Sequence, residues 1–345
     1  MLGARSIPAG SRALGSGEHT SRHRCARPPS FVPVARYRAR AMLIVPAYAK
    51  VNLALEVLGR RSDGYHEVAT VITAIDWHDL VAVHVTRGEG GVTVHITGGE
   101  REWAAPGELV HAAASALAAL AGRASDLRIH VFKRLPVAAG LGGGSADAAA
   151  VLRAGAAQLR TLGIDIDVAE LGSVAASLGS DVPAMLAAGA VLATGRGEQL
   201  RPLPPPSLHL AVAVIASVST GAAYGALCAE ELGSLGRVDR VAAALAAGTT
   251  PAEADLGSAL ETAACRASPA LGEALVTLRR TVPGVAWHLT GSGGAAFASA
   301  RDAAAARRLA AAVRAAGFPA RPCRTLGVPV LADRRAARVI AVTGA

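Results

Sequence analysis

The chain has very little lysine, few aromatic side chains and no long hydrophobic run. Only Lys50 and Lys133 are lysines, against 33 arginines, so each lysine is a strong candidate for a specific role. Aromatic residues make up 3% of the sequence. No apolar run reaches the roughly 18–20 residues that cross a bilayer, and the longest, at 208–218, suits a buried strand. We therefore expect no membrane association.

Cysteine is also scarce and scattered. The four cysteines, Cys25, Cys228, Cys265 and Cys323, are far apart in the sequence and form no CxxC pair. This pattern argues against a structural zinc site, and the sequence predicts no protein metal centre. It is typical of reduced thiols, and we expect a cytoplasmic protein.

The positive charge is concentrated at the N-terminus. The formal net charge is +9, and residues 1–41 hold eight arginines and one acid, Glu18, leaving about +2 for the rest. The body has no basic stripe with interleaved aromatics, so we expect it to bind no nucleic acid. Segment 1–41 is predicted to be a disordered basic extension. A true start at Met42 is favoured over a transit peptide, and a nucleic-acid-binding tail comes third.

A glycine-rich loop within residues 135–150 is the most informative stretch. Residues 127–134 alternate like a half-buried strand, and glycines follow at 140, 142, 143 and 144. Ser145 then opens an alanine-rich helix. Glycine allows close backbone approach to an anion, and the amides of a helix start point at it. The loop predicts phosphate binding, but it matches neither the Walker A nor the GxGxxG pattern, and it could simply connect strand to helix.

The remaining pattern predicts mixed helices and strands in two domains, 42–201 and 207–326, divided at the proline cluster 202–206 and followed by a loose tail at 327–345. A short helix begins at Ser180 or Asp181, and either side chain could cap it. Strands are expected at 43–58, 67–76, 80–86, 92–97, 127–134, 190–194, 208–217, 285–289 and 295–299. Helices are expected at 106–120, 146–160, 168–178, 220–232, 238–247, 256–266, 269–280 and 303–316.

Three segments, taken in order, resemble the GHMP kinases: the opening strand with Lys50, the glycine loop, and a second glycine loop, TGSGG, at 290–294. The resemblance spans roughly residues 45–326. The strings PAYAKVNLALEVLGRRSDGYHEV, GLGGGSADAAA and GSDVPAML are similar to the 4-diphosphocytidyl-2-C-methyl-D-erythritol kinases. The resemblance implies an α+β, two-domain fold with the active site in the cleft between domains. It also implies ATP-dependent phosphorylation of the substrate's 2-hydroxyl in the non-mevalonate isoprenoid pathway.

The resemblance assigns catalysis to Asp181, as the acceptor of the hydroxyl proton, and to Lys50, which steadies the charge. ATP would bind with Mg²⁺, and Ser145 could contact a phosphate or the metal, or cap the helix. The ATP-phosphate residues implied are Pro136, Val137, Ala138, Ala139, Gly140, Leu141, Gly142, Gly143, Gly144, Ser145 and Ala146.

For the second substrate, the resemblance implies a cytosine held by Tyr65 and His66 and stacked between Tyr65 and Tyr224. Thr220 belongs to the same predicted site. Lys133 could reach the nucleotide or be only a charge at a strand end. The loop at 291–294 would close against the substrate.

Two positions depart from the family pattern: Glu108 stands where an asparagine usually contacts the purine, and Ser258-Ala259 stand where Asn-Asp is frequent. The alternatives are another GHMP-type kinase for homoserine, mevalonate or a sugar, and a nucleotide-binding module without catalysis. We expect a small-molecule substrate and a monomer or weak homodimer.

Overall fold

The computed structural model describes residues 42–99, 107–122, 124–187, 189–233, 236–327 and 338–340. The extension at 1–41 and most of the predicted tail lie outside these ranges. The described residues form an eight-stranded and a four-stranded sheet with helices packed on both, which confirms the α+β class. Within them, no helix is both long enough and apolar enough to span a bilayer.

The large sheet is built on a long antiparallel hairpin, β1 (Met42–Arg60) and β2 (His66–Arg87). Its main order is β12-β1-β2-β4-β3, with β3 at Val92–Gly98, β4 at Ser125–Lys133 and β12 at Arg338–Ile340. The pair β5 (Ala190–Thr194) and β6 (Gln199–Leu203) extends β2, and β8 (Gly257–Ser258) runs parallel to β1. Strand β12 lies within the segment predicted as a tail.

The two strands predicted at 67–76 and 80–86 are one. Residues 78 and 79 stay paired with Tyr48 and Ala47, and a register shift in the hairpin lies between Tyr48 and Lys50. Asp79 is fully buried within this strand, where a carboxylate is rare. Here the backbone amide of Leu135 donates to its Oδ1 at 2.7 Å, so the charge is satisfied.

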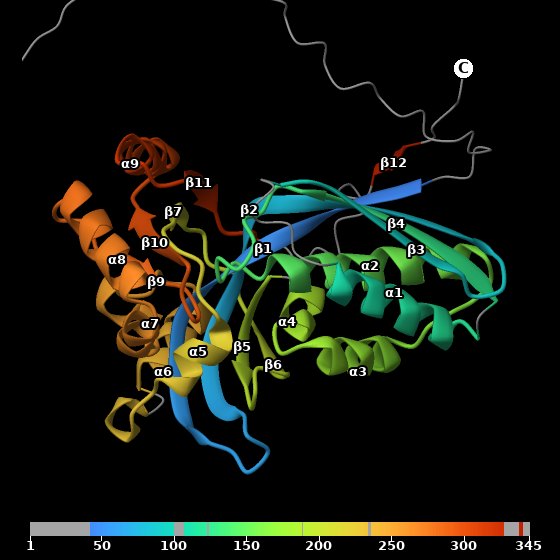
Figure 1. The fold of residues 1–345 in the computed structure, drawn as a ribbon, viewed down its shortest axis with the longest axis horizontal. Coiled ribbons are helices and arrows are strands. Elements are labelled where there is room, and N and C mark those ends of the chain that lie inside the picture. The colour runs from blue at the N-terminus through green and yellow to red at the C-terminus, as the bar shows by residue number, and fades with distance from the viewer. Residues whose placement is uncertain are drawn as a thin grey trace, which may run out of the picture. The chain divides into compact units, whose positions relative to one another are not determined.

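Helices α1 (Glu108–Leu120), α2 (Gly143–Thr161) and α4 (Val182–Ala187) pack on one face of the large sheet, and α3 (Val168–Leu178) packs on these helices, as Figure 1 shows. Alanine and glycine let α1 and α2 approach closely, since a Cβ at Gly155 would overlap Leu117. Helix α3 matches its predicted range and begins with a capping box between Asp167 and Glu170.

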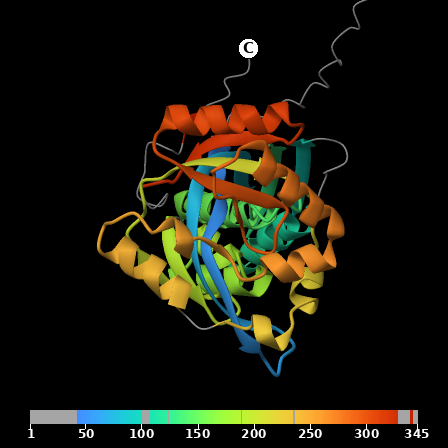
Figure 2. The ribbon, with the colours of Figure 1, turned by 90° about the vertical axis from the view of Figure 1, so that its left-hand side faces the viewer.

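The small sheet has the order β11-β7-β10-β9, formed by Ala320–Arg324, His209–Val214, Ala295–Ala300 and His288–Leu289. Helices α8 (Pro269–Thr281) and α9 (Ala303–Ala315) pack on its outer face, where α9 lies across the top of Figure 2. Around this sheet lie α5 (Thr220–Gly225), α6 (Gly236–Ala246) and α7 (Glu261–Ala267), with short 3₁₀ turns η2 (Ala229–Glu231) and η3 (Glu253–Asp255).

Two helix predictions in this half were too long. The helix predicted at 220–232 ends at Gly225, and the one predicted at 256–266 starts only at Glu261. In the second case Gly257 has a φ of +112° and pairs with β1, so tertiary pairing overrides the helical pattern.

The inner face of the small sheet joins the large one through a common core. Phe297 and Val212 pack with Val51 and Leu53 of β1 and with Val241 of α6. The glycine loop and the hairpin are therefore supported by residues from both halves of the chain. The domain boundary at 202–206 stays a prediction.

Candidate active site

The glycine loop connects β4 to α2 as predicted, but the helix begins earlier than the alanine run suggests. Gly142 occupies the N-cap with a φ of +69°, and α2 starts at Gly143. The alternative of Ser145 as the cap is therefore wrong. The first helical bond runs from the Ala146 N–H to the Gly142 carbonyl at 2.8 Å, so the amides of residues 143–145 have no partner within the helix. Such amides suit an anion.

The two glycine loops lie against each other. Gly294, with a φ of +93°, has no room for a side chain, since a Cβ would lie 2.8 Å from the Ala138 carbonyl oxygen. A Cβ at Gly140 would overlap the Gly293 carbonyl oxygen. Ala138 itself has a positive φ of +54°, a strained value for a non-glycine residue. The second loop therefore supports the shape of the first.

A cavity of about 410 Å³ lies along the first loop. Residues 136–145 line it, so the structure brings together every predicted ATP-phosphate residue except Ala146, which is buried beneath the loop. Lys50, Lys133 and Asp181 also line this cavity. The stripped glycine backbone, the free helix-start amides and the nearby ammonium groups fit a polyphosphate.

Lys50 and Asp181 meet although 131 positions separate them in the chain. The Lys50 ammonium lies 3.4 Å from Asp181 Oδ2, with Lys50 buried and Asp181 partly exposed. The main chain of Asp181 begins α4 by accepting the Met185 N–H at 3.0 Å, whereas its carboxylate faces Lys50. The carboxylate is thus available to an incoming hydroxyl.

Asn52, which the sequence reasoning did not single out, orients Lys50. The Lys50 ammonium donates to Asn52 Oδ1 at 2.7 Å, and Asn52 Nδ2 donates to Thr70 Oγ1 at 2.9 Å. Thr70 in turn donates to the Ala54 carbonyl at 2.7 Å, and the Asn52 N–H donates to Thr290 Oγ1 at 2.8 Å. The available signal was the spacing: two residues apart on a strand, Lys50 and Asn52 share a face.

Below the loop, Lys133 sits between two buried carboxylates. Its ammonium contacts Asp147 Oδ2 at 2.8 Å and also Asp79. Asp147 Oδ1 is buried and has no hydrogen-bond partner among the described residues. Burial raises the pKa of Asp147 to about 7, with Asp79 adding to the rise and Lys133 opposing it. Burial lowers the pKa of Lys133, but the two carboxylates outweigh it and the net pKa is raised.

The position of Lys133 refines its predicted role. It lines the cavity along the glycine loop and is absent from the lining of the larger pocket that holds Tyr65 and His66. A contact with ATP is therefore compatible with this placement, and a contact with the second substrate's base is not.

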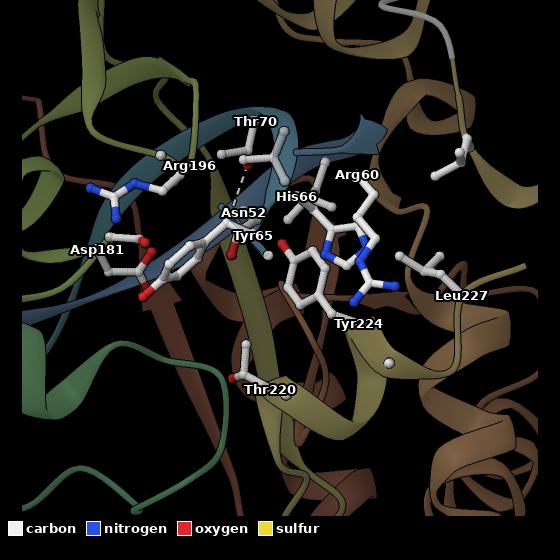
Figure 3. Close-up of a pocket in the computed structure, with 18 of the residues that line it drawn as sticks. Asn52, Arg60, Tyr65, His66, Thr70, Asp181, Arg196, Thr220, Tyr224 and Leu227 are labelled. Carbon is white, nitrogen blue, oxygen red and sulfur yellow. Dashed lines mark hydrogen bonds between the residues drawn. The ribbon is translucent and has the colours of Figure 1, made fainter. Parts of the chain in front are cut away.

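The larger pocket, of about 880 Å³, opens beside the tip of the β1–β2 hairpin (Figure 3). Tyr65 and His66 come from the hairpin, and Thr220 and Tyr224 from α5, so all four predicted residues line it. Tyr65 is 52% exposed, as a ring waiting for a stacking partner would be. The two tyrosines stand on the same pocket, which fits the predicted sandwich.

His66 packs on Tyr224, with ring centroids 5.1 Å apart at 35°. Burial and the charge of Arg60 lower the pKa of His66, which favours a neutral ring that can both donate and accept. Burial, and then the Asp181 carboxylate, raise the pKa of Tyr224, so its hydroxyl stays protonated.

The two cavities meet at Asp181. Their shared lining residues are Asn52, Leu55, Ser145, Asp181, Thr220 and Tyr224. One molecule on the glycine loop and another in the larger pocket would therefore approach each other at Asp181. This geometry suits direct transfer between two bound molecules.

The departures Glu108 and Ser258 differ in what they touch. Glu108 is the exposed first residue of α1, and neither cavity includes it in its lining. Ser258 is buried and donates to the Gly291 carbonyl at 2.7 Å, so it fastens the second glycine loop. The departure from the family pattern at Ser258 therefore coincides with a structural role.

Comparison with known proteins agrees with the family resemblance seen in the sequence. The model of the GHMP kinases N terminal domain matches residues 108–189. A 4-diphosphocytidyl-2-C-methyl-D-erythritol kinase of Rhizorhabdus wittichii is 39% identical over 73% of this chain and 83% of its own length. The kinase of that name from Kineococcus radiotolerans is 41% identical over 78% and 85%.

Solved structures agree. A crystal structure of 4-(cytidine 5'-diphospho)-2C-methyl-D-erythritol kinase matches with a TM-score of 0.66 and 34% identity, over 83% of this chain and 100% of that one. A homoserine kinase from Cytophaga hutchinsonii matches with a TM-score of 0.61 at 19% identity, over 85% and 97%, which shows the shared fold alone.

Proposed function

The chain belongs to the 4-diphosphocytidyl-2-C-methyl-D-erythritol kinases of the GHMP kinase family, and we propose how its residues carry out that phosphorylation. ATP places its phosphates along residues 136–145, and the cytidylated polyol occupies the larger pocket. The observation that carries this reading is the meeting of both cavities at Asp181, 3.4 Å from the Lys50 ammonium.

In the reaction, the substrate's 2-hydroxyl attacks the γ-phosphorus of ATP. A bond forms between that oxygen and phosphorus, the bond to the β–γ bridging oxygen breaks, and ADP leaves. Asp181 orients the hydroxyl and accepts its proton. Lys50, held by Asn52, lies where charge develops on the transferred group. The amides at the start of α2 neutralise charge on the remaining phosphates.

Mg²⁺ would accompany the nucleotide, and the residues present fit that role. Ser145 and Asp181 supply oxygen atoms on the lining shared by both cavities. Among the described residues no group of three or more acidic, histidine or cysteine side chains could hold a metal alone. Mg²⁺ characteristically takes few protein ligands and is otherwise bound by phosphate oxygens and waters. When bound, it would neutralise negative charge on the phosphates.

The base is recognised by the aromatic cluster. Tyr65 and Tyr224 offer ring faces to a pyrimidine, and the neutral His66 ring bonds its edge. This cluster separates the proposed substrate from mevalonate, homoserine or a sugar, which have no base to stack.

The test is ADP release by the full chain with Mg-ATP, using the cytidylated methylerythritol, mevalonate, homoserine and galactose as acceptors. We expect turnover only with the cytidylated acceptor. Turnover with a different acceptor would leave the phosphate loop in place but overturn the base site.

The roles of the two catalytic residues are tested by substitution. Asp181→Asn should lower kcat by roughly 10²- to 10⁴-fold with ATP binding retained. Asp165→Asn is a matched control, because this carboxylate is 75% exposed and forms a surface ion pair with Arg160. A folded Asp181→Asn enzyme with near wild-type kcat would show that Asp181 is not the base.

A further inference from the structure

Arg196 stands on the larger pocket with no assigned role. It lies in the tight turn between β5 and β6, flanked by Gly195 and Gly197 with φ values of +74° and +111°. The turn is fixed to β2 because the Val68 N–H donates to the Gly195 carbonyl at 2.8 Å. Its position is thus set by backbone contacts.

The same turn approaches the catalytic segment. A Cβ at Gly197 would lie 3.4 Å from the Ser180 carbonyl oxygen, one residue before Asp181. Figure 3 shows Arg196, Asp181 and Tyr65 in the same part of the pocket. Arg196 is therefore placed beside the site of transfer.

The guanidinium carbon lies over the Tyr65 ring, 4.9 Å from its centroid, within the range of a cation–π pair. In the described part of the chain, its acidic partner within ion-pair distance is Glu198, at 3.9 Å. Glu198 is already engaged, because its Oε2 accepts the Arg196 N–H at 2.7 Å. Among the residues that the structure describes, most of the five guanidinium donors thus remain open to a ligand.

The covalent order of the proposed substrate sets where its charge falls: base, ribose, diphosphate, polyol. The base lies at the aromatic cluster, and the reacting hydroxyl lies at Asp181. The diphosphate must cross the interval between them, which Arg196 borders. Arg60, the other arginine on this pocket, lies on the far side of Tyr224 in Figure 3, beyond the base.

We propose that Arg196 is a specificity-determining residue, whose guanidinium stacks on Tyr65 and binds the diphosphate of the cytidylated substrate. This inference rests on the proposed function. It assigns one side chain two tasks: the ring stack orients the guanidinium plane, and the paired donors bind phosphate oxygens in a fork.

The experiment compares cytidine with CDP as competitive inhibitors of the full-length wild type and of Arg196→Gln. For Arg196→Gln we expect CDP to bind about tenfold more weakly and cytidine to change less than about twofold. The KM for the cytidylated substrate should rise similarly with little change in kcat. Raising the salt concentration should weaken CDP binding to the wild type more than to the variant, because ions screen the contact.

Arg201→Gln is the matched control, since it removes an exposed arginine from the same hairpin. It should change the affinity for neither cytidine nor CDP. Equal weakening of cytidine and CDP would mean that Arg196 only supports Tyr65, which overturns the proposal, as would no change for either. Failure of the wild type to bind CDP or to turn over the cytidylated substrate would instead refute the proposed function.

Discussion

Asp147 provides the sharpest test of the electrostatics below the glycine loop. Burial beside Asp79 raises its pKa from 3.8 to about 7, so the folded protein holds a proton that the unfolded chain releases near pH 4. A raised carboxyl pKa adds stability at low pH, and this contribution is lost as the pH rises through 7. Where only the native state is protonated, the free energy of unfolding falls by about 1.4 kcal/mol per pH unit.

Asp147→Asn replaces this group with one that stays neutral and can still accept a hydrogen bond from Lys133. Relative to this variant, the wild type should lose about 2 kcal/mol between pH 5 and pH 7 and less than about 0.5 kcal/mol from pH 7 to pH 8. The stability of the variant relative to the wild type should therefore increase as the pH rises. Urea unfolding of both proteins at half-unit pH steps measures this difference.

Asp165→Asn is again the control, because its carboxylate is exposed, and its difference from the wild type should stay within about 0.5 kcal/mol at every pH. A difference between wild type and Asp147→Asn that does not change from pH 5 to pH 8 would refute the reasoning. It would mean that Lys133 holds Asp147 ionised throughout this range.

Two further predictions concern packing around the site. Gly294→Ala should lower stability and raise the KM for ATP several-fold, because a Cβ would lie 2.8 Å from a carbonyl oxygen of the first glycine loop. Gly284 is the control, because it has a positive φ but open space around it. Gly284→Ala should lower the free energy of unfolding by only about 1 kcal/mol and leave the KM for ATP unchanged. Thr70→Val should cost about 1–3 kcal/mol in urea unfolding, since it leaves the buried Asn52 amide without its acceptor, whereas Thr277→Val on an exposed helix surface should cost less than about 0.5 kcal/mol.

The parts of the site that the sequence predicted are those formed by residues close together in the chain. The strand, glycine loop and helix lie consecutively between residues 127 and 160, and their periodicity and glycine content define them without tertiary information. The rarity of lysine drew attention to Lys50, but its predicted catalytic role came from the family resemblance. Asp181 and the aromatic residues depended on the family resemblance, because a helix cap or a tyrosine in a loop has no unique local meaning.

The missed residues act through partners distant in the sequence. Asn52 binds the hydroxyl of Thr290, 238 positions away, and Asp79 accepts the amide of Leu135, 56 positions away. No window of local periodicity contains both members of such a pair. The same limitation applies to strand β2, which was predicted as two strands on either side of Asp79. A buried carboxylate is tolerable there only once the loop that donates hydrogen bonds to it is in place.

The second glycine loop shows how the meaning of a motif changes with its neighbours. Its sequence predicted closure against the substrate, and Gly291 and Ser292 do line the phosphate cavity. Gly294, however, faces the first loop, where a Cβ would press on the main chain of residues 138–139, and a Cβ at Gly293 would press on Leu271 and Leu289. The first loop can keep its strained shape only while this surface supports it. The cavity proposed to hold phosphate is therefore lined jointly by two segments about 150 residues apart, and its shape depends on the contact between them.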